Sequence, residues 1–377
     1  MKNKSTIDQD RYRKYTLIGL MAILAIILLI IFFTRPGEVP GSISTDGTKV
    51  GVIMLGPRDD KCWNQSHFQG LEEARRKLNL DVTYKETVPP TEASREVIEE
   101  LIASGNQIII VDSSAYSQYV IEAAERHPEV FFFHATGFVT KDNLLTYFGK
   151  IYEMRYLTGI VAGLQTKTNE IGYVAPFSHP EVIRGIDAFT LGVRKVNKNA
   201  KVYVKWTNSW NNDGVTEKAT RDLLSHHEID VLTMHSDSLK PLEVAEEQGI
   251  YSIGYNMDNS KSYPKSFLTA PIWNWGDFYT EQIRNCVNGK FKGKSYWEGV
   301  DKGMVDLAPL SKNVSSKVKE RITVYKRAMT DGTLNVFYGP IRDQEGNQIV
   351  DKGECISDEV LLRTLDIFVE GVVMDED

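Results

Sequence analysis

Short apolar runs of strand length alternate with segments of helical periodicity along most of this chain. A first set of runs lies at residues 49–55, 81–85, 107–111 and 130–134, and a second set at residues 170–175, 201–206, 230–235 and 250–256. The pattern restarts after a long helix-like segment at residues 152–165. Strands separated by helices predict right-handed βαβ units and parallel sheets. We therefore expect an α/β fold with two doubly wound parallel-sheet lobes joined by a hinge.

The same pattern divides the chain into segments. Residues 49–151 predict lobe 1, and residues 152–270 predict lobe 2. We expect residues 271–330 to return to lobe 1, and residues 331–377 to form a C-terminal segment that packs on the lobes. Ligands of open α/β sheets bind beyond the carboxyl ends of the strands. The cleft between the two lobes is therefore the expected site.

An uncharged and mostly apolar run occupies residues 15–33, after a basic start at residues 1–14. Its length suits a hydrocarbon core of about 30 Å, and a basic flank is typical of the cytoplasmic side. Residues 34–48 are rich in Gly, Pro, Ser and Thr and predict a flexible linker. We expect a single-pass anchor in the cell membrane, with both lobes outside the cytoplasm. The alternative is a cleavable secretion signal, whose apolar core is usually shorter, about 7–15 residues.

Charge and cysteine content narrow the function classes. The formal net charge is −7, and no basic stripe follows the apolar run, which argues against a nucleic-acid partner. The three cysteines, Cys62, Cys286 and Cys355, lie far apart and have no metal-site spacing. The P-loop and H-E-x-x-H patterns are also absent. We expect neither a metal nor a cofactor.

The loop after the first strand, GPRDDKCWNQS, carries a distinctive group of residues. Asp60 precedes Trp63, and Asn64 follows at the start of a predicted helix. A tryptophan in a glycine-led polar loop suits ring stacking better than core packing. Asn64 has an alternative structural role, because asparagine caps helix N-termini well.

The other candidates follow later strands or lie in the connection back to lobe 1: Ser113, Tyr116, Trp210, Asp237, Asp258 and Trp273. A flat ligand can be held between two aromatic faces, and carboxylates in its plane would accept bonds from ring N–H and amino groups. The alternatives are that the tryptophans pack the interlobe surface or the hinge, and that Asp258 only forms a turn.

Catalytic patterns are weak in this chain. His235, Ser236 and Asp237 are consecutive, but no G-x-S-x-G nucleophile elbow is present. Asp59 and Asp60 are neighbours, and neighbouring side chains point in different directions, so they cannot flank one glycosidic bond. We therefore expect no enzyme activity.

Several longer stretches resemble the BMP (basic membrane protein) family, also called the purine-nucleoside-receptor-A-like family, of ABC transporter substrate-binding proteins. The resemblance extends over about residues 49–372. It rests on the stretches DDKCWNQSHFQGLEEA, YEMRYLTGIVAGLQTKTNEIGYV, AFTLGVRKVNKNAKV, SWNNDGVTEKAT and SIGYNMD, with a tail of the form FYGPIRDQEGNQ. It implies a type I periplasmic-binding-protein fold that closes on a purine.

The resemblance also implies roles for individual residues. Asp60 would contact the base, with Trp63 and Asn64 beside it, and Trp210 would stack on the opposite face. Asp258 would take the place of the aspartate that binds ribose in nucleoside receptors. Those receptors carry a lysine after the next strand, whereas this chain has TAPIWNW, with Trp273 in that region. A bulky Trp273 would fill space that a ribose needs, so the expected ligand is a free base such as adenine, with nucleosides weaker.

These expectations define a membrane-anchored receptor that delivers a purine base or nucleoside to the permease subunits of an ABC importer. A first rival is a surface sensor or regulatory protein of the same fold. A second rival is a nucleoside-processing enzyme, which would need an acid–base or metal set that the sequence does not show.

Overall fold

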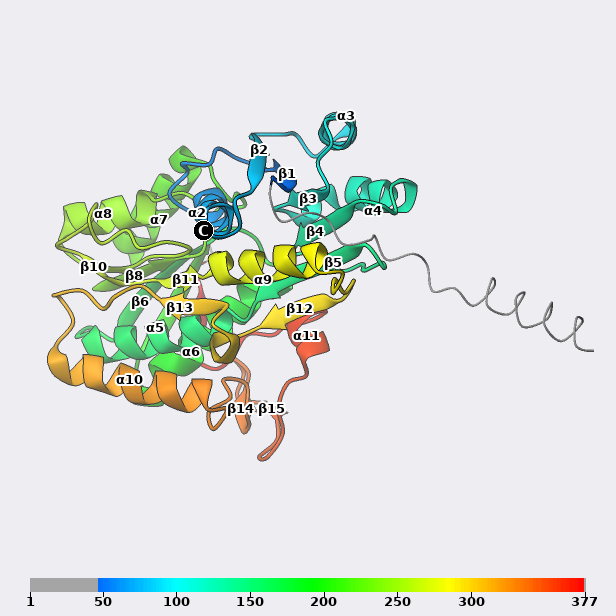
Figure 1. Ribbon diagram of the computed structural model, residues 1–377. Coiled ribbons are helices and arrows are strands. Elements are labelled where there is room, and N and C mark those ends of the chain that lie inside the picture. The colour runs from blue at the N-terminus through cyan, green and yellow to red at the C-terminus, as the bar shows by residue number, and fades with distance from the viewer. Residues whose placement is uncertain (1–46, 376–377) are drawn as a thin grey trace, which may run out of the picture.

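Two parallel six-stranded sheets form the framework of the protein (Figure 1). The computed structural model describes residues 47–375. The strand order is β12-β5-β4-β3-β1-β2 in lobe 1 and β10-β9-β8-β6-β7-β16 in lobe 2. The predicted α/β class with two parallel sheets is therefore confirmed.

Lobe 1 is a sheet covered by helices on both faces. Its strands are β1 (Lys49–Ile53), β2 (Asp81–Lys85), β3 (Ile108–Val111), β4 (Phe131–Ala135), β5 (Leu144–Gly149) and β12 (Ser295–Glu298). Its helices are α2 (Trp63–Leu78), α3 (Glu92–Ala103), the 3-10 turn η1 (Ser114–Tyr116), α4 (Ser117–Arg126) and α9 (Trp275–Val287). All four residues of β3 are buried, as expected for a central parallel strand.

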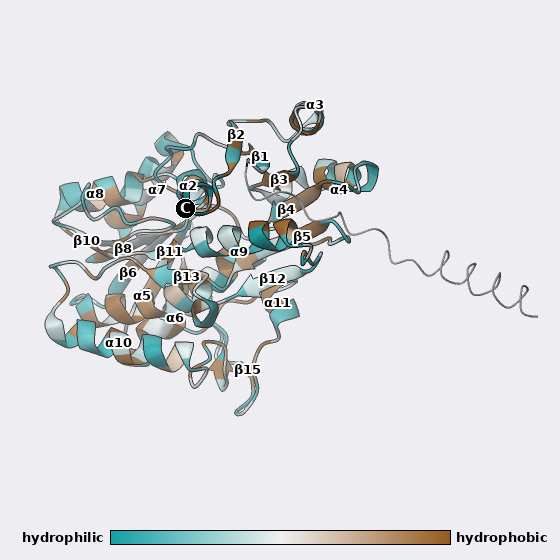
Figure 2. Cartoon of the chain, in the orientation of Figure 1, coloured by the Kyte–Doolittle hydropathy of each residue, from teal (hydrophilic) through white to brown (hydrophobic). Residues whose placement is uncertain are grey.

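Lobe 2 repeats this organisation. Its strands are β6 (Glu170–Ala175), β7 (Lys201–Trp206), β8 (Val231–Met234), β9 (Tyr251–Ile253), β10 (Phe267–Thr269) and β16 (Val372–Met374). Its helices are α5 (Tyr152–Gln165), α6 (Pro180–Val196), α7 (Asp213–His226), α8 (Lys240–Gln248) and α10 (Ser316–Thr330). Figure 2 shows the apolar strands enclosed by helices whose outer faces are polar.

The chain passes between the lobes at three places: between β5 and α5, between β10 and α9, and between β12 and α10. Two of these connections contain short strands, β11 (Pro271–Trp273) and β13 (Val305–Leu307), which pair antiparallel. The 3-10 turn η2 (Val300–Lys302) lies just before β13. Residues 271–330 thus contribute to both lobes, because α9 and β12 extend lobe 1 whereas α10 packs against α5 of lobe 2.

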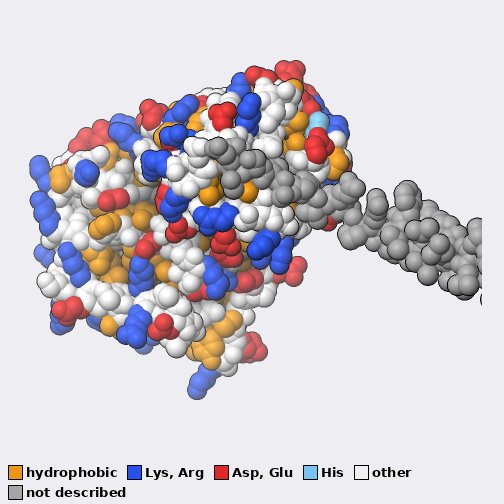
Figure 3. Space-filling model, viewed as in Figure 1, with side chains coloured by type: hydrophobic (Ala, Val, Ile, Leu, Met, Phe, Trp, Pro, Cys, Tyr) orange, Lys and Arg blue, Asp and Glu red, His pale blue; other side chains and the backbone are white. Residues whose placement is uncertain are grey.

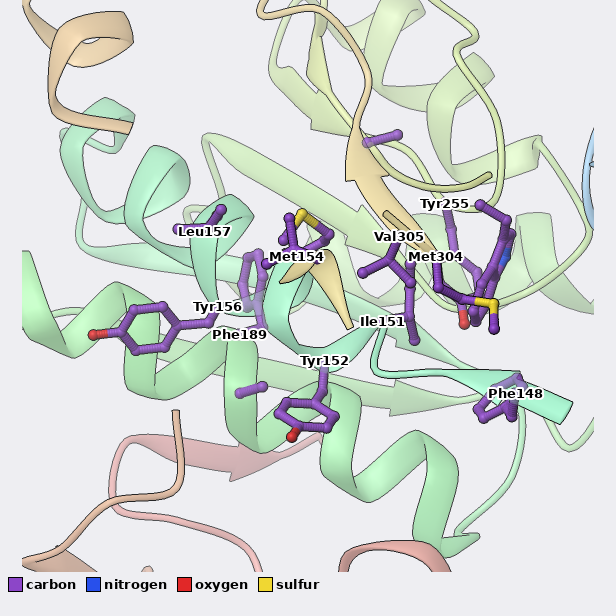
Figure 4. Close-up of a cluster of buried hydrophobic side chains, with 14 of the residues drawn as sticks. Phe148, Ile151, Tyr152, Met154, Tyr156, Leu157, Phe189, Tyr255, Met304 and Val305 are labelled. Atoms are coloured by element: carbon purple, nitrogen blue, oxygen red, sulfur yellow. The ribbon is translucent and has the colours of Figure 1, made fainter. Parts of the chain in front are cut away.

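Apolar side chains fill the connection between the lobes. Phe148, Ile151 and Met154, at the first connection, pack in one buried cluster with Val305 and Tyr255 (Figure 4). This cluster joins the two lobes through a continuous core, which holds the strand ends of lobe 1 opposite those of lobe 2.

The C-terminal segment lies mainly on lobe 2. It forms a hairpin from β14 (Ile341–Arg342) and β15 (Gln348–Val350), then the short helix α11 (Asp358–Arg363), and ends with β16. Strand β16 extends the lobe 2 sheet by pairing parallel to β7. An ion pair of 3.0 Å between Lys205 Nζ and Asp375 Oδ2 holds the last described residue.

Acidic and basic side chains are mixed over the face seen in Figure 3. Within residues 47–375, every helix is too short or too polar to cross a bilayer. The predicted membrane span at residues 15–33 and the basic stretch before it lie outside the described residues, as does nearly all of the predicted linker.

Candidate functional site

Asp60 fixes the start of helix α2 at the cleft. Its Oδ1 accepts hydrogen bonds from the backbone N–H groups of Cys62 (2.8 Å) and Gln65 (2.9 Å). Its Oδ2 accepts from the backbone N–H of Asn64 (3.0 Å) and from the Asn64 amide (2.7 Å). A carboxylate at a helix N-terminus satisfies free N–H groups and interacts favourably with the helix dipole. The capping role considered for Asn64 therefore belongs to Asp60.

Asn64 connects the helix to the loop that precedes it. Its Oδ1 accepts a bond of 2.9 Å from the backbone N–H of Gly56. A side-chain carbon at Gly56 would lie 2.7 Å from the Asn64 amide nitrogen, so this approach requires glycine. Asp60, Asn64 and Gly56 thus form one rigid corner of the site.

Trp63 presents its ring to the cleft from lobe 1. Its Nε1 donates to the backbone carbonyl of Asp112 over 2.9 Å. It packs edge-to-face with Trp273 and Trp275, with centroid distances of 5.5 and 5.9 Å. Trp273 and Trp275 stack on each other at 4.7 Å. This aromatic cluster fixes the orientation of Trp63.

Trp210 stands on the opposite lobe, in the loop after β7. It is 37% exposed, and its nearest aromatic neighbour is Phe177, at a centroid distance of 6.1 Å. Its backbone carbonyl accepts a bond of 2.7 Å from the N–H of Asp237. The two predicted stacking rings therefore come from different lobes and line the same pocket.

Two further carboxyl groups lie at this pocket. Asp112, at the end of β3, is 1% exposed and accepts from the backbone N–H of Leu55 at 3.1 Å. Asp237, beyond β8, accepts from the Asn256 amide at 2.9 Å. Burial raises the pKa of both carboxyl groups to about 8, and the charge of Asp60 adds to this effect. Among the described residues neither acid forms an ion pair, and their carboxyl oxygens are suited to accept N–H donors from a ligand.

The pocket between the lobes has a volume of about 210 Å³. This is below the range of about 300–1,000 Å³ that is typical of sites for drug-sized ligands, so the pocket suits a small molecule. It is lined by Leu55, Gly56, Pro57, Asp60, Trp63, Asn64, Asp112, Ser113, Ser114, Thr136, Glu181, Trp210, Asn211, Asp237, Tyr255 and Asn256.

Six of the predicted residues line this pocket: Asp60, Trp63, Asn64, Ser113, Trp210 and Asp237. The structure places Tyr116 elsewhere, because the turn η1 directs it into lobe 1, where its hydroxyl donates to the carbonyl of Val88 over 2.6 Å. Asp258 is exposed and accepts from the N–H of Ser260 at 2.9 Å, in a separate hollow. Trp273 lies behind Trp63 and does not line the pocket.

The predicted site did not include these polar pocket residues: Asp112, Ser114, Thr136, Glu181, Asn211, Tyr255 and Asn256. Asp112 follows a predicted strand and Asn256 ends one, so their positions carried a usable signal. Thr136 lies one residue beyond β4, and Glu181 lies six residues beyond β6 in the first turn of α6, where nothing in the sequence marks either residue as part of a site.

The consecutive residues His235, Ser236 and Asp237 do not form a catalytic triad. His235 Nδ1 lies 2.9 Å from the Tyr173 hydroxyl, and the Ser236 hydroxyl donates to the Ser238 carbonyl over 3.2 Å. Burial lowers the pKa of His235 to about 4. Within the described part of the chain, no cluster of three or more His, Cys, Asp or Glu residues could hold a metal ion.

Known proteins are similar to this chain in sequence. A purine-binding protein of Brucella abortus is 33% identical over 86% of this chain and 92% of its own length. A Haloferax volcanii ABC transporter protein, whose name gives glucose as its proposed ligand, is 32% identical over 90% of this chain and 86% of its own length. The transcriptional activator protein med of Bacillus subtilis is 25% identical over 73% and 86%.

Solved structures agree on the fold. A transcriptional activator of the comK gene from Bacillus halodurans has a TM-score of 0.69 at 23% identity, covering 76% of this chain and 99% of that protein. An ABC transporter solute-binding protein from Conexibacter woesei has a TM-score of 0.66 at 18% identity, covering 77% and 98%. The model of the PnrA-like ABC transporter substrate-binding proteins matches residues 47–333. These are solute-binding proteins and not a family of enzymes. The chain therefore belongs to the PnrA-like family of ABC transporter substrate-binding proteins.

Proposed function

We propose that the protein is a receptor that closes its two lobes on a free purine base such as adenine. The observation that carries this proposal is the small pocket to which each lobe contributes one tryptophan and one buried acid. Trp63 and Asp112 come from lobe 1, and Trp210 and Asp237 come from lobe 2. A planar base held between the rings would donate its N–H groups to the carboxyl oxygens of Asp112 and Asp237. The name of the Brucella relative supports a purine ligand.

The hydrogen bonds around Trp273 favour a free base over a nucleoside as the ligand. The Trp273 Nε1 donates to Asn256 Oδ1 over 2.8 Å, and the Asn256 amide donates to Asp237 Oδ1 over 2.9 Å. These polar atoms bond one another, and the indole occupies the region where the family resemblance implies a ribose. Little hydrogen-bonding capacity is left there for sugar hydroxyls.

The proposed mechanism is population shift without covalent chemistry. A ligand that contacts both lobes binds the closed arrangement better and thereby stabilises it. The closed receptor would then dock on the permease subunits of an ABC importer. We further propose that residues 15–33 anchor the receptor in the cell membrane, with the lobes outside the cytoplasm.

Calorimetry with adenine, guanine, adenosine and guanosine tests the ligand. We expect a base to bind more tightly than its nucleoside, and clearly tighter nucleoside binding would overturn the free-base proposal. Mass spectrometry of the ligand that copurifies with the protein provides an independent identification. Protease treatment of intact cells, which should digest the lobes and spare cytoplasmic proteins, tests the orientation in the membrane.

A sensor role is the second candidate, because the Bacillus subtilis relative is named a transcriptional activator. In that case closure would signal to a partner protein and would not deliver the solute. Deletion of the gene distinguishes the two roles: a transport receptor is needed for uptake of labelled adenine at low concentration, whereas a sensor is not.

A further inference from the structure

We call the pocket between the lobes, where the purine is proposed to bind, the purine pocket. A second cavity adjoins it and shares Ser114, Thr136 and Glu181 with it. Its volume is about 110 Å³. On the same volume scale, a single water molecule needs only about 10–15 Å³. The cavity therefore has room for a compact polyatomic group. The remaining walls are Gly137, Phe138, Tyr147, Phe148, His179, Arg184, Ser295, Tyr296, Trp297, Leu362 and Arg363. We call this cavity the arginine pocket.

Arg184 is a buried cation in this wall. It comes from α6, is 2% exposed, and its Nη1 donates to the backbone carbonyl of Leu361. Its guanidinium lies 5.5 Å from the centroid of the Trp297 ring. Among the ion pairs of the described residues, none includes Arg184, and the nearby Glu181 lies 3.9 Å from His235, whose lowered pKa leaves it neutral. A buried guanidinium without a carboxylate at contact distance is costly, and an anionic ligand would offset that cost.

Arg363 brings a second guanidinium to the same cavity. It ends helix α11, is exposed, and lies over the Phe138 ring at 5.2 Å. Helix α11 is held to lobe 2 by its buried Leu361 and is linked to the end of β5 by an ion pair of 3.2 Å between Asp358 and Lys150. Arg363 belongs to the segment beyond residue 333, where the match to the family model ends. The cation is therefore supplied by the C-terminal segment, which the family model does not cover.

The charge of the arginine pocket differs from that of its neighbour. Two arginines face one carboxylate, Glu181, whose pKa is raised by burial but lowered further by His235 and Arg184, so that it stays below its usual value. The purine pocket is lined by three aspartates and by Glu181, with no Lys or Arg among the described residues that line it. Burial keeps Asp112 and Asp237 largely protonated at neutral pH, so the purine pocket suits a neutral base and the arginine pocket suits an anion.

We propose that the arginine pocket binds an oxyanion, a phosphate or carboxylate group, between Arg184 and Arg363. Guanidinium groups form bidentate bonds to such groups, and the hydroxyls of Ser114, Thr136 and Ser295 are further donors in the lining. The oxyanion either binds as a free ion beside the base or is a substituent of the purine ligand. The distinction between a free ion and a substituent rests on the proposed purine function, whereas the anion site itself does not.

The test compares three ligands with the full-length protein: inorganic phosphate alone, adenine with and without phosphate, and adenosine 5′-monophosphate. Sodium chloride keeps the ionic strength constant. Thermal unfolding and calorimetry are measured for the wild type, Arg363→Ala, Arg184→Met and the control Arg327→Ala, whose side chain is 83% exposed on α10. Arg363→Ala changes an exposed residue, so the test does not depend on whether Arg184→Met folds.

We expect phosphate to raise the melting temperature of the wild type and of Arg327→Ala, and to have no effect on Arg363→Ala. A free anion predicts that phosphate also strengthens adenine binding. A substituent predicts that the monophosphate binds about tenfold or more tightly than adenine, and that Arg363→Ala removes this difference. That result would also show that a ribose fits beside Trp273, and would overturn the free-base preference. The proposal is overturned if neither phosphate nor the monophosphate shows a response that depends on these arginines. Adenine binding by the wild type without phosphate tests the purine function separately, so the two proposals can fail independently.

Discussion

The indole Nε1 of Trp273 donates a hydrogen bond of 2.8 Å to the side-chain carbonyl of Asn256. Each residue is fixed on its other side as well, because Trp273 stacks on Trp275 and the Asn256 amide donates to Asp237. The pair joins the connection between the lobes to the wall of the pocket between the lobes, and the indole ring of Trp273 occupies space next to that pocket.

Shortening Trp273 should relax the choice between base and nucleoside. We expect Trp273→Ala to open a space beside Asn256, so that the preference for adenine over adenosine falls about tenfold or more. Trp273→Phe is the matched control, since it keeps a ring but loses the indole N–H. Calorimetry with both ligands measures the ratio. An unchanged ratio in the alanine variant would show that Trp273 does not exclude the sugar.

The two pocket tryptophans should each contribute to affinity. We expect Trp63→Ala and Trp210→Ala to weaken adenine binding by about 1–3 kcal/mol each, the value for loss of one base–aromatic stack. Trp63→Phe keeps a ring and loses only the bond to the Asp112 carbonyl, so it should retain most of the affinity. Calorimetry measures all three variants. If both alanine variants bind as the wild type does, the ligand lies elsewhere.

The buried acids predict that stability falls as the pH rises. The folded pKa of Asp112 is raised by burial to about 8, whereas an unfolded aspartate has a pKa of about 3.9. The folded protein therefore binds the extra proton between these values. The stabilising contribution is complete below about pH 4 and is lost as the pH rises through about 8, with a slope of at most about 1.4 kcal/mol per pH unit for this group.

The Asp112→Asn variant tests this dependence, because an amide resembles the protonated acid and can still accept from Leu55. The free energy of unfolding, measured with urea between about pH 6 and 9, should decline less steeply with pH in this variant than in the wild type. Asp277→Asn is the control, since that side chain is 83% exposed. Equal slopes for the wild type and Asp112→Asn would contradict the raised pKa.

Asp187 should stabilise the C-terminal segment. Its carboxyl group is 1% exposed and accepts from the backbone N–H of Val369 over 3.0 Å. We expect Asp187→Ala to lower the free energy of unfolding by about 1–3 kcal/mol, because the Val369 N–H loses its partner. Asp187→Asn retains an acceptor and should cost much less. Urea unfolding compares the two, and equal losses would mean that the hydrogen bond is not the cause.

The alternation of apolar runs was sufficient to predict two parallel sheets, because buried parallel strands are apolar on both faces. It did not reveal β5, β10, β12 or β16. For β12 and β16 the reason is that SYWE and VVM are short and lie far along the chain from the strands that they join. Pairing between distant segments is decided by tertiary packing, which a local pattern does not record.

The sequence predicted which strand ends form the site, but it did not predict the direction in which each side chain points. Trp63 and Trp210 follow strands and line one pocket, whereas Tyr116 also follows a strand and turns inward. Near the end of β9, Asn256 adopts a positive φ of 66° and enters the pocket, while Asp258 does not. The direction of each residue depends on backbone angles in its loop, which the residue type leaves open.

The pairing of β16 with β7 sets an order of events during folding. Val372 aligns with Val202, so the outer strand of the lobe 2 sheet comes from near the end of the described chain. Contacts between such distant residues form slowly, because a long loop must close before they are made. Until then β7 has an open edge, and open edges promote pairing between chains. Lobe 2 should therefore be prone to aggregation until β16 is in place.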